Sequence, residues 1–414
     1  MNRIASLPIL VVLVALALGG IACSKPELSS CDITQRACQE EIYFHLLSLR
    51  GDGYDPFGGL PPMTVISEQT YRKQLEDEAA QSAADGPNPW DQALALLHFT
   101  SSSSGANPDG GAGSDAGSST IDDEVAHIMA FYDPNTKTVT VISHPSQTGT
   151  DAMNEAMSTL AHELTHALQD NELDLSKQFH TSDKYFANDA IIEGDARFYE
   201  DLFQKDVYTM LGQKTKDVLT WPDLELTWDY ENFDQLGSPL FAARALVYPL
   251  GARVEANEYR SGGNAAIRHG YAKAPARTVG LLVGPDGVVP PVGSGNVCPA
   301  PYVAALPTSG KSTGADEFGA LLLYTFLRGW GVDHDTAFSA AQTWTGDFLR
   351  VQASADYATT AAAWRIEFSH APAASIVQAL TATGQLAAVA DERSLQITVS
   401  DAASKPTWTA ALCQ

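Results

Sequence analysis

The segment STLAHELTHALQDNE, residues 158–172, contains two histidines four positions apart and a glutamate directly after the first. Apolar residues recur every three or four positions along it and just before it, which predicts an amphipathic helix. Four residues advance a helix by about 6 Å and rotate it by about 40°, so the imidazoles of His162 and His166 share one face. Both can therefore reach a single metal ion, while Glu163 lies beside it.

A third metal ligand is expected on a second helix. The stretch YFANDAIIEGDARFYEDLF, residues 185–203, has helical periodicity, and the connection before it is long enough to bring it alongside the first helix. It presents Glu193, and two imidazoles with one carboxylate are typical of a zinc site that keeps a fourth position open. Gly194 costs about 1 kcal/mol relative to alanine within a helix, which indicates that this helix approaches the metal helix closely.

Glu163 has the chemistry of a general base. A zinc ion lowers the pKa of a water toward about 7, and a neighbouring carboxylate can take the proton. The alternative is an ordinary amphipathic helix whose solvent-facing side chains include histidine and glutamate by chance. We favour Zn²⁺ bound by His162, His166 and Glu193, with Glu163 as the catalytic base.

The motif HELTHALQD, followed by EGDA at residues 193–196, resembles the gluzincin metallopeptidases of the peptidase MA clan, especially a group of bacterial exported proteins of unassigned substrate. The resemblance is clearest over residues 120–275. It implies the same zinc ligands and the same general base. It also implies an α+β, zincin-like fold, with an active-site helix under a small mixed or antiparallel sheet and a mainly helical C-terminal subdomain.

A second segment, VYPLGARVEANEYRSGG at residues 247–263, resembles the Tyr-x-x-Gly helix of aminopeptidase-type gluzincins. In that branch the tyrosine hydroxyl stabilises the oxyanion, which implies this catalytic role for Tyr248. Leu250 stands where that branch usually has lysine, and the GAMEN-type exopeptidase signature is absent. Endopeptidase and exopeptidase activity therefore both stay open.

Three further residues of the second helix are candidates for a role at the site. Asp189 or Asp195 is placed to orient a ligand histidine, although an acidic residue on such a helix is more often solvated. Tyr199 is an alternative oxyanion donor, and simple packing is its other interpretation.

The chain begins with an export signal that leads to a cysteine. A basic residue, an apolar run at residues 7–18 and small residues before Cys23 have the order of a signal peptide. Residues 20–23, GIAC, resemble the bacterial lipobox, although Gly20 replaces the usual leucine. We expect a lipoprotein anchored through Cys23 at the outer membrane, in the periplasm or at the cell surface. Simple secretion and a retained membrane anchor are the alternatives.

Four cysteines remain if Cys23 carries lipid. An even number of cysteines in an oxidising compartment suits two disulfides. Of the three possible pairings we favour Cys31–Cys38 with Cys298–Cys413, although spacing alone does not prove it.

The formal net charge of −25 on 414 residues restricts the partners. Such a chain repels nucleic acid and anionic membrane surfaces. The expected partners are therefore a peptide or protein substrate, and a membrane only through the lipid anchor. The oligomeric state is left open.

Composition and pattern divide the chain into four parts. Residues 1–22 are the signal peptide, 23–62 a tether with a short helix, 63–235 the zincin α/β part and 236–414 the mainly helical C-terminal subdomain. Within the third part, residues 100–120 are rich in Ser, Gly, Asp and Ala, which predicts a disordered insertion.

Three short segments have recognisable patterns. MTVIS at residues 63–67 predicts a strand, and residues 126–143 predict a hairpin closed by the turn sequence DPNTK. AAAWRIEFSH at residues 361–370 is interpreted as a helix.

The favoured function is zinc-dependent hydrolysis of peptide bonds at the cell envelope. One alternative is a noncatalytic envelope lipoprotein or binding module with a structural or vestigial zinc site. Another is hydrolysis of a non-peptide bond on the same zinc. The intact Glu163 favours catalysis, because a closed structural site has no need of a general base.

Overall fold

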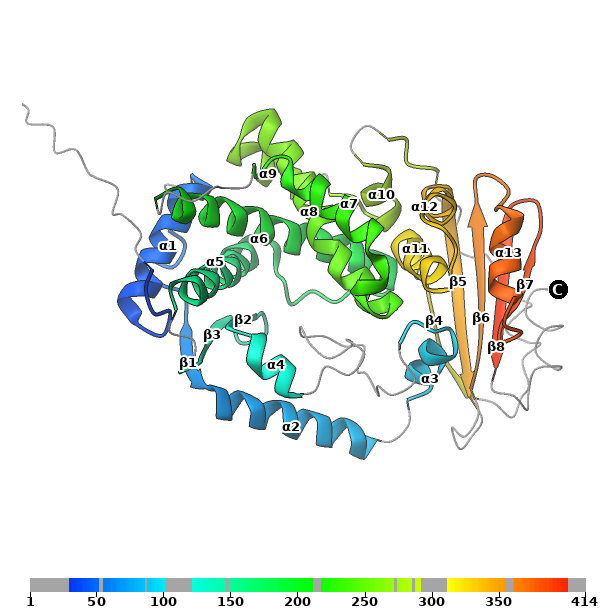
Figure 1. Cartoon of the computed structure of the whole chain (residues 1–414), viewed down its shortest axis with the longest axis horizontal. Coiled ribbons are helices and arrows are strands. Elements are labelled where there is room, and N and C mark those ends of the chain that lie inside the picture. Colours follow the sequence, from blue (N-terminus) through cyan, green and yellow to red (C-terminus); the bar gives the residue numbers. More distant parts are fainter. Residues whose placement is uncertain are drawn as a thin grey trace, which may run out of the picture.

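The computed structural model describes ten stretches of the chain, residues 30–51, 55–85, 88–100, 121–145, 149–210, 217–271, 274–284, 287–291, 311–353 and 360–400. Figure 1 shows a small sheet at one end of the molecule, a larger sheet at the other and a group of helices between them. The expected α+β class is therefore confirmed.

The first part of the chain contains short strands and helices: α1 (Arg36–Arg50), β1 (Met63–Ser67), α2 (Glu68–Asp85), α3 (Pro89–Leu96), α4 (Ile121–His127), β2 (Ala130–Asp133) and β3 (Thr138–Ser143). The central part is helical: α5 (Thr150–Leu173), α6 (Ser182–Met210), α7 (Trp221–Glu231), the 3₁₀ turn η1 (Phe233–Leu236), α8 (Pro239–Gly262), α9 (Asn264–Tyr271) and α10 (Thr278–Val283). The last part alternates: β4 (Lys311–Asp316), α11 (Gly319–Gly329), α12 (His334–Gln342), β5 (Trp344–Ala353), β6 (Thr360–Phe368), α13 (Ala374–Thr381), β7 (Ala387–Ala390) and β8 (Ser394–Ser400).

The small sheet has the order β1-β3-β2 and is mixed, because β1 runs parallel and β2 antiparallel to β3. The expected strand at residues 63–67 and the expected hairpin are both confirmed. Asp133 closes the hairpin turn by accepting hydrogen bonds from the Asn135 backbone and the Thr136 hydroxyl at 2.9 and 2.7 Å. The helix α5, which carries both histidines, packs against β2 and β3.

The large sheet has the order β4-β5-β6-β8-β7, with antiparallel pairing throughout. The prediction of a helix at residues 361–370 is wrong, since residues 361–368 belong to strand β6. Buried Trp364, Ile366 and Phe368 alternate there with half-buried charged side chains, a period of two that suits a strand. The alanines that suggested a helix are instead buried between neighbouring strands. The part expected to be mainly helical, 236–414, therefore also contains a five-stranded sheet.

Two hydrophobic cores meet along α6 and α8. The first half of α6, with Ile191, belongs to the core under the large sheet, and its second half, with Phe198, belongs to the core under the small sheet. The helix α8 divides in the same way, with Leu246 in the former core and Ala256 in the latter. Both helices therefore bridge the two halves of the molecule.

Gly194 and Gly251 let α6 and α8 approach closely. A Cβ atom on Gly194 would lie 2.2 Å from the Gly251 carbonyl carbon, and one on Gly251 would lie 1.5 Å from the Ala190 carbonyl oxygen. The expectation that Gly194 faces the metal helix α5 is corrected, because its neighbour is α8. Successive helical residues point about 100° apart, so Glu193 faces α5 while Gly194 faces α8.

The cysteine pair Cys31–Cys38 forms a disulfide, as expected. Four other predictions concern residues outside the described stretches. They are the signal peptide at 1–22, the lipidated Cys23, the pair Cys298–Cys413 and the insertion at 100–120, of which only Thr100 is described. Among the described residues no helix has both the length and the apolar character to cross a membrane.

We predict that Gly251→Ala destabilises the protein by more than about 3 kcal/mol, because a methyl group would overlap the backbone of α6. Gly149→Ala is the control, since that glycine has an ordinary φ of −79° and nothing within 4 Å of an added Cβ. It should cost less than about 1 kcal/mol. Denaturant unfolding measures both, and equal losses for the two variants would contradict the prediction.

Candidate metal centre

The helix α5 holds both histidines on a buried surface. Its apolar side chains, such as Leu160 and Leu164, are fully buried in the core beneath the small sheet. His162 and His166 are themselves only 8% and 7% exposed. Their burial excludes the interpretation in which the two imidazoles lie on a solvated helix face.

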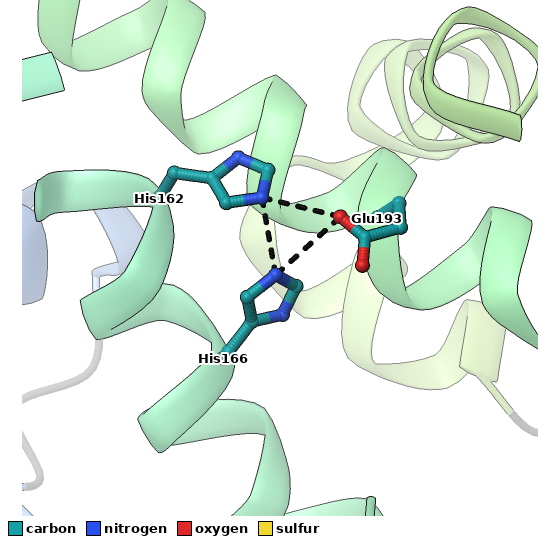
Figure 2. Close-up of side chains that lie close together, drawn as sticks. All are labelled: His162, His166 and Glu193. Atoms are coloured by element: carbon teal, nitrogen blue, oxygen red, sulfur yellow. Dashed lines mark hydrogen bonds and ion pairs between the residues drawn. The ribbon is translucent and has the colours of Figure 1, made fainter. Parts of the chain in front are cut away.

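Three donor atoms converge between α5 and α6 (Figure 2). The Nε2 atoms of His162 and His166 lie 3.1 Å apart, and the Oε2 atom of Glu193 lies 3.2 and 3.4 Å from them respectively. Ligand atoms about 2.0–2.1 Å from a tetrahedral zinc ion lie about 3.3–3.4 Å from one another. The spacing and the chemistry of this donor set therefore fit a zinc ion with three protein ligands.

An acidic side chain contacts His162 on the ring nitrogen that faces away from the other two donor atoms. Its Nδ1 atom lies 3.2 Å from Oε2 of Glu200, which lies two helical turns after Glu193 on α6. Arg197 donates to Glu200 at 3.1 Å and to Glu225 of α7 at 3.3 Å. The carboxylate thus stays ionised and can accept the Nδ1 proton, which leaves Nε2 free to bind a metal.

His166 is held by an amide. Its Nδ1 atom lies 2.8 Å from Oε1 of Gln169, one turn further along α5. Asp195, a candidate for orienting a ligand histidine, accepts a hydrogen bond from Gln169 at 2.8 Å and so reaches His166 only through the amide. It is 0% exposed, so the alternative of a solvated aspartate is wrong. Asp189 has no hydrogen bond to either imidazole among those of the described residues.

Glu163 lies next to the donor atoms and is fixed by the hairpin. Its Oε2 atom accepts a hydrogen bond from the Tyr132 backbone amide of β2 at 2.8 Å. The Tyr132 hydroxyl also donates to Asp170 on α5, so the strand and the metal helix are tied together at two points. Burial raises the pKa of Glu163 above its usual value, although the charges of His166 and His162 oppose the rise.

Tyr248 reaches the site from α8, and its ring centroid lies 6.0 Å from that of His162. The charge of Glu193, together with burial, raises the pKa of the Tyr248 hydroxyl well above its usual range, so the hydroxyl stays protonated and can donate. Tyr199 is placed elsewhere. It is buried, donates to Asn264 at 2.9 Å and lies under the guanidinium of Arg50.

The buried charges around the imidazoles favour a cation. Burial alone would lower the pKa of His162, but hydrogen bonds to Glu193 and Glu200 raise it well above its usual value. The pKa of Glu193 falls below its usual value despite burial, because of the charge of His166 and the hydrogen bonds to both imidazoles. Likewise Arg197 lowers the pKa of Glu200 to about 2 against the effect of burial. A divalent ion supplies the positive charge that these carboxylates attract.

The predicted ligands His162, His166 and Glu193 are brought together, with Glu163 and Tyr248 beside them. Sequence reasoning missed the two partners that orient the histidines, Gln169 and Glu200. Helical periodicity offered a signal for both, because Gln169 lies three residues after His166 and Glu200 seven after Glu193. Periodicity does not say which of the many polar residues on a face turns inward.

We predict that the protein binds about one zinc ion per chain and that His166→Ala loses most of it, because two remaining ligands hold the ion poorly. The matched control is His144→Ala. That histidine is also buried, with a side chain 5% exposed, but its Nε2 atom contacts the Ile128 carbonyl at 2.8 Å. Elemental analysis of dialysed protein checks both variants. Full zinc content in His166→Ala would place the metal elsewhere.

Comparison with family models, curated proteins and solved structures finds no match for the chain. The resemblance to gluzincins therefore rests on the motifs themselves. The remaining guide to function is the geometry that α5, α6 and α8 create around His162, His166 and Glu193.

Proposed function

We propose that this protein is a zinc-dependent hydrolase of peptide bonds, of the gluzincin type and with a zincin-like catalytic half. One observation carries the proposal: two imidazole nitrogens and a carboxylate oxygen lie 3.1–3.4 Å from one another, with the carboxylate of Glu163 beside them. A zinc ion bound there supplies a Lewis acid that polarises a carbonyl and lowers the pKa of a water toward about 7.

Glu163 acts as the general base in this proposal. The Tyr132 amide engages Oε2 and so orients the carboxylate, which leaves Oε1 to take a proton from the attacking water. Burial raises the pKa of Glu163, which makes it a stronger base than an exposed glutamate. The same carboxyl group then passes the proton to the leaving amine.

Tyr248 acts as the oxyanion donor. Its hydroxyl stays protonated beside Glu193 and points into the site from a third helix, so it can donate to the oxygen that gains charge during attack. The close contact of Gly251 with α6, one turn after Tyr248, holds this helix in place.

The hairpin strand supports a peptide as substrate. β2 is an edge strand of the small sheet, and its residue Tyr132 lies against Glu163. Extended peptides pair with exposed strand edges through main-chain hydrogen bonds. A substrate strand beside β2 would present a peptide bond near Glu163, which favours peptide hydrolysis over hydrolysis of other bonds.

A catalytic role is favoured over the noncatalytic envelope module. A structural zinc site is usually closed by four protein ligands, whereas three donors converge among the described residues. The proposed location is the cell envelope, with export through residues 1–22 and a lipid anchor on Cys23.

We predict that Glu163→Gln keeps its zinc and loses nearly all turnover of an unfolded protein substrate such as casein. The amide has the same shape but cannot take a proton from water. Glu155→Gln, an exposed change two turns earlier on α5, is the control and should stay fully active. Zinc content is measured on the same samples, and chelator should abolish wild-type activity. If zinc-replete Glu163→Gln still turned over the substrate, Glu163 would not be the general base.

We predict that Tyr248→Phe lowers kcat and kcat/KM together by about 10²–10³, because a donor to the transition state is lost while the ring still packs. Tyr259→Phe is the matched control on the same helix, where the ring packs against Phe198 in the core under the small sheet. Zinc content and melting temperature should stay near the wild-type values in both. A loss below about threefold in Tyr248→Phe would indicate packing alone.

A further inference from the structure

Gln169 is a fully buried amide that contacts a proposed metal ligand. Its side chain is 0% exposed, and its Oε1 atom lies 2.8 Å from Nδ1 of His166. The opposite ring nitrogen of His166, Nε2, is the one that faces His162 and Glu193. The amide therefore lies directly behind the imidazole as seen from the site.

The orientation of the Gln169 amide is determined by its other partners. Its Nε2 atom donates to the Ile192 carbonyl and to Oδ2 of Asp195, each at 2.8 Å. Both partners are acceptors, so a flipped amide would place oxygen against two oxygens. The Oε1 atom of Gln169 must therefore face His166. Because Oε1 can only accept a hydrogen bond, the Nδ1 atom of His166 must carry the proton.

Asp195 is in turn held by buried donors from other helices. Its Oδ2 atom accepts a hydrogen bond from Nη1 of Arg50 at 3.0 Å and another from the Tyr271 hydroxyl at 2.5 Å. Asp195 and Arg50 are 0% and 1% exposed. The guanidinium of Arg50, at the end of α1, therefore lies against this buried carboxylate and supplies it with an ion-pair partner.

We propose that Gln169 is a positioning residue for the metal centre, which holds His166 in the tautomer that offers Nε2 to the ion. The chain of hydrogen bonds runs from Arg50 through Asp195 and Gln169 to His166. The N-terminal helix α1 is thereby part of the support of the site. This inference rests on the proposed zinc site but not on peptidase activity.

The test compares Gln169→Met with Gln39→Met. Methionine matches the length of glutamine, but it cannot donate to Asp195 and its sulfur is only a weak acceptor for His166. Gln39 of α1 is also buried, at 5% exposure, and donates to the Ile33 carbonyl at 2.8 Å. Both variants lose buried hydrogen bonds, and only Gln169→Met touches a proposed ligand.

The measured quantities are the zinc dissociation constant, by competition with a chelator, and the melting temperature of the metal-free protein. Both variants should melt at a lower temperature than wild type. Gln169→Met should bind zinc about 10–100-fold more weakly, whereas Gln39→Met should keep the wild-type affinity. Affinity within about twofold of wild type in Gln169→Met, or an equal loss in Gln39→Met, would overturn the inference.

A measurement on the wild type covers the case in which Gln169→Met does not fold. Long-range ¹H–¹⁵N spectra of the zinc-loaded protein should show a proton on Nδ1 of His166 that is protected from exchange with water. An unprotonated or freely exchanging Nδ1 would overturn the role of Gln169. A wild-type protein that binds no zinc at all would instead overturn the proposed function, and the inference with it.

Discussion

The contact between α6 and α8 at Gly194 and Gly251 is the constraint on which the site depends. Helices whose facing residues carry a Cβ atom cannot approach as closely as these two, where an added Cβ would lie 1.5 Å from the Ala190 carbonyl oxygen. Because α6 carries Glu193 and α8 carries Tyr248, this close approach brings a metal ligand and a phenol toward the same point. The two hydrophobic cores hold the pair of helices from both sides.

The second constraint is electrostatic. The imidazoles lie among buried or partly buried carboxylates, and the cost of burying those charges is offset by two arginines, the buried Arg50 and the partly exposed Arg197. Arg197 pairs with Glu200 behind His162, and Arg50 pairs with Asp195, which contacts Gln169 behind His166. Each of the two histidines therefore contacts a partner that is itself held by a charged side chain, so that little reorganisation would be needed for a cation to bind.

Helical spacing alone was enough to predict which three donor groups come together. Positions four apart on one helix share a face in any protein, so His162 and His166 were paired without knowledge of the fold, and Glu193 followed from its place on the next helix. The hairpin of β2 and β3 could be predicted in the same way, because its turn residues and both of its strands lie within one short stretch of sequence. The disulfide Cys31–Cys38 also joins near neighbours in the chain.

Long-range packing decided what such local patterns leave open. The sequence determined that Gly194 needed a close neighbour, but only the fold showed that this neighbour is Gly251 rather than the metal helix. It determined which polar residues lie on each helix, but the choice of Gln169 and Glu200 as partners of the histidines depended on which faces were buried. The alanine-rich stretch of β6 became a strand for the same reason: pairing with β5 and β8 outweighs local helix propensity, and the partners in β8 lie beyond the reach of a local pattern.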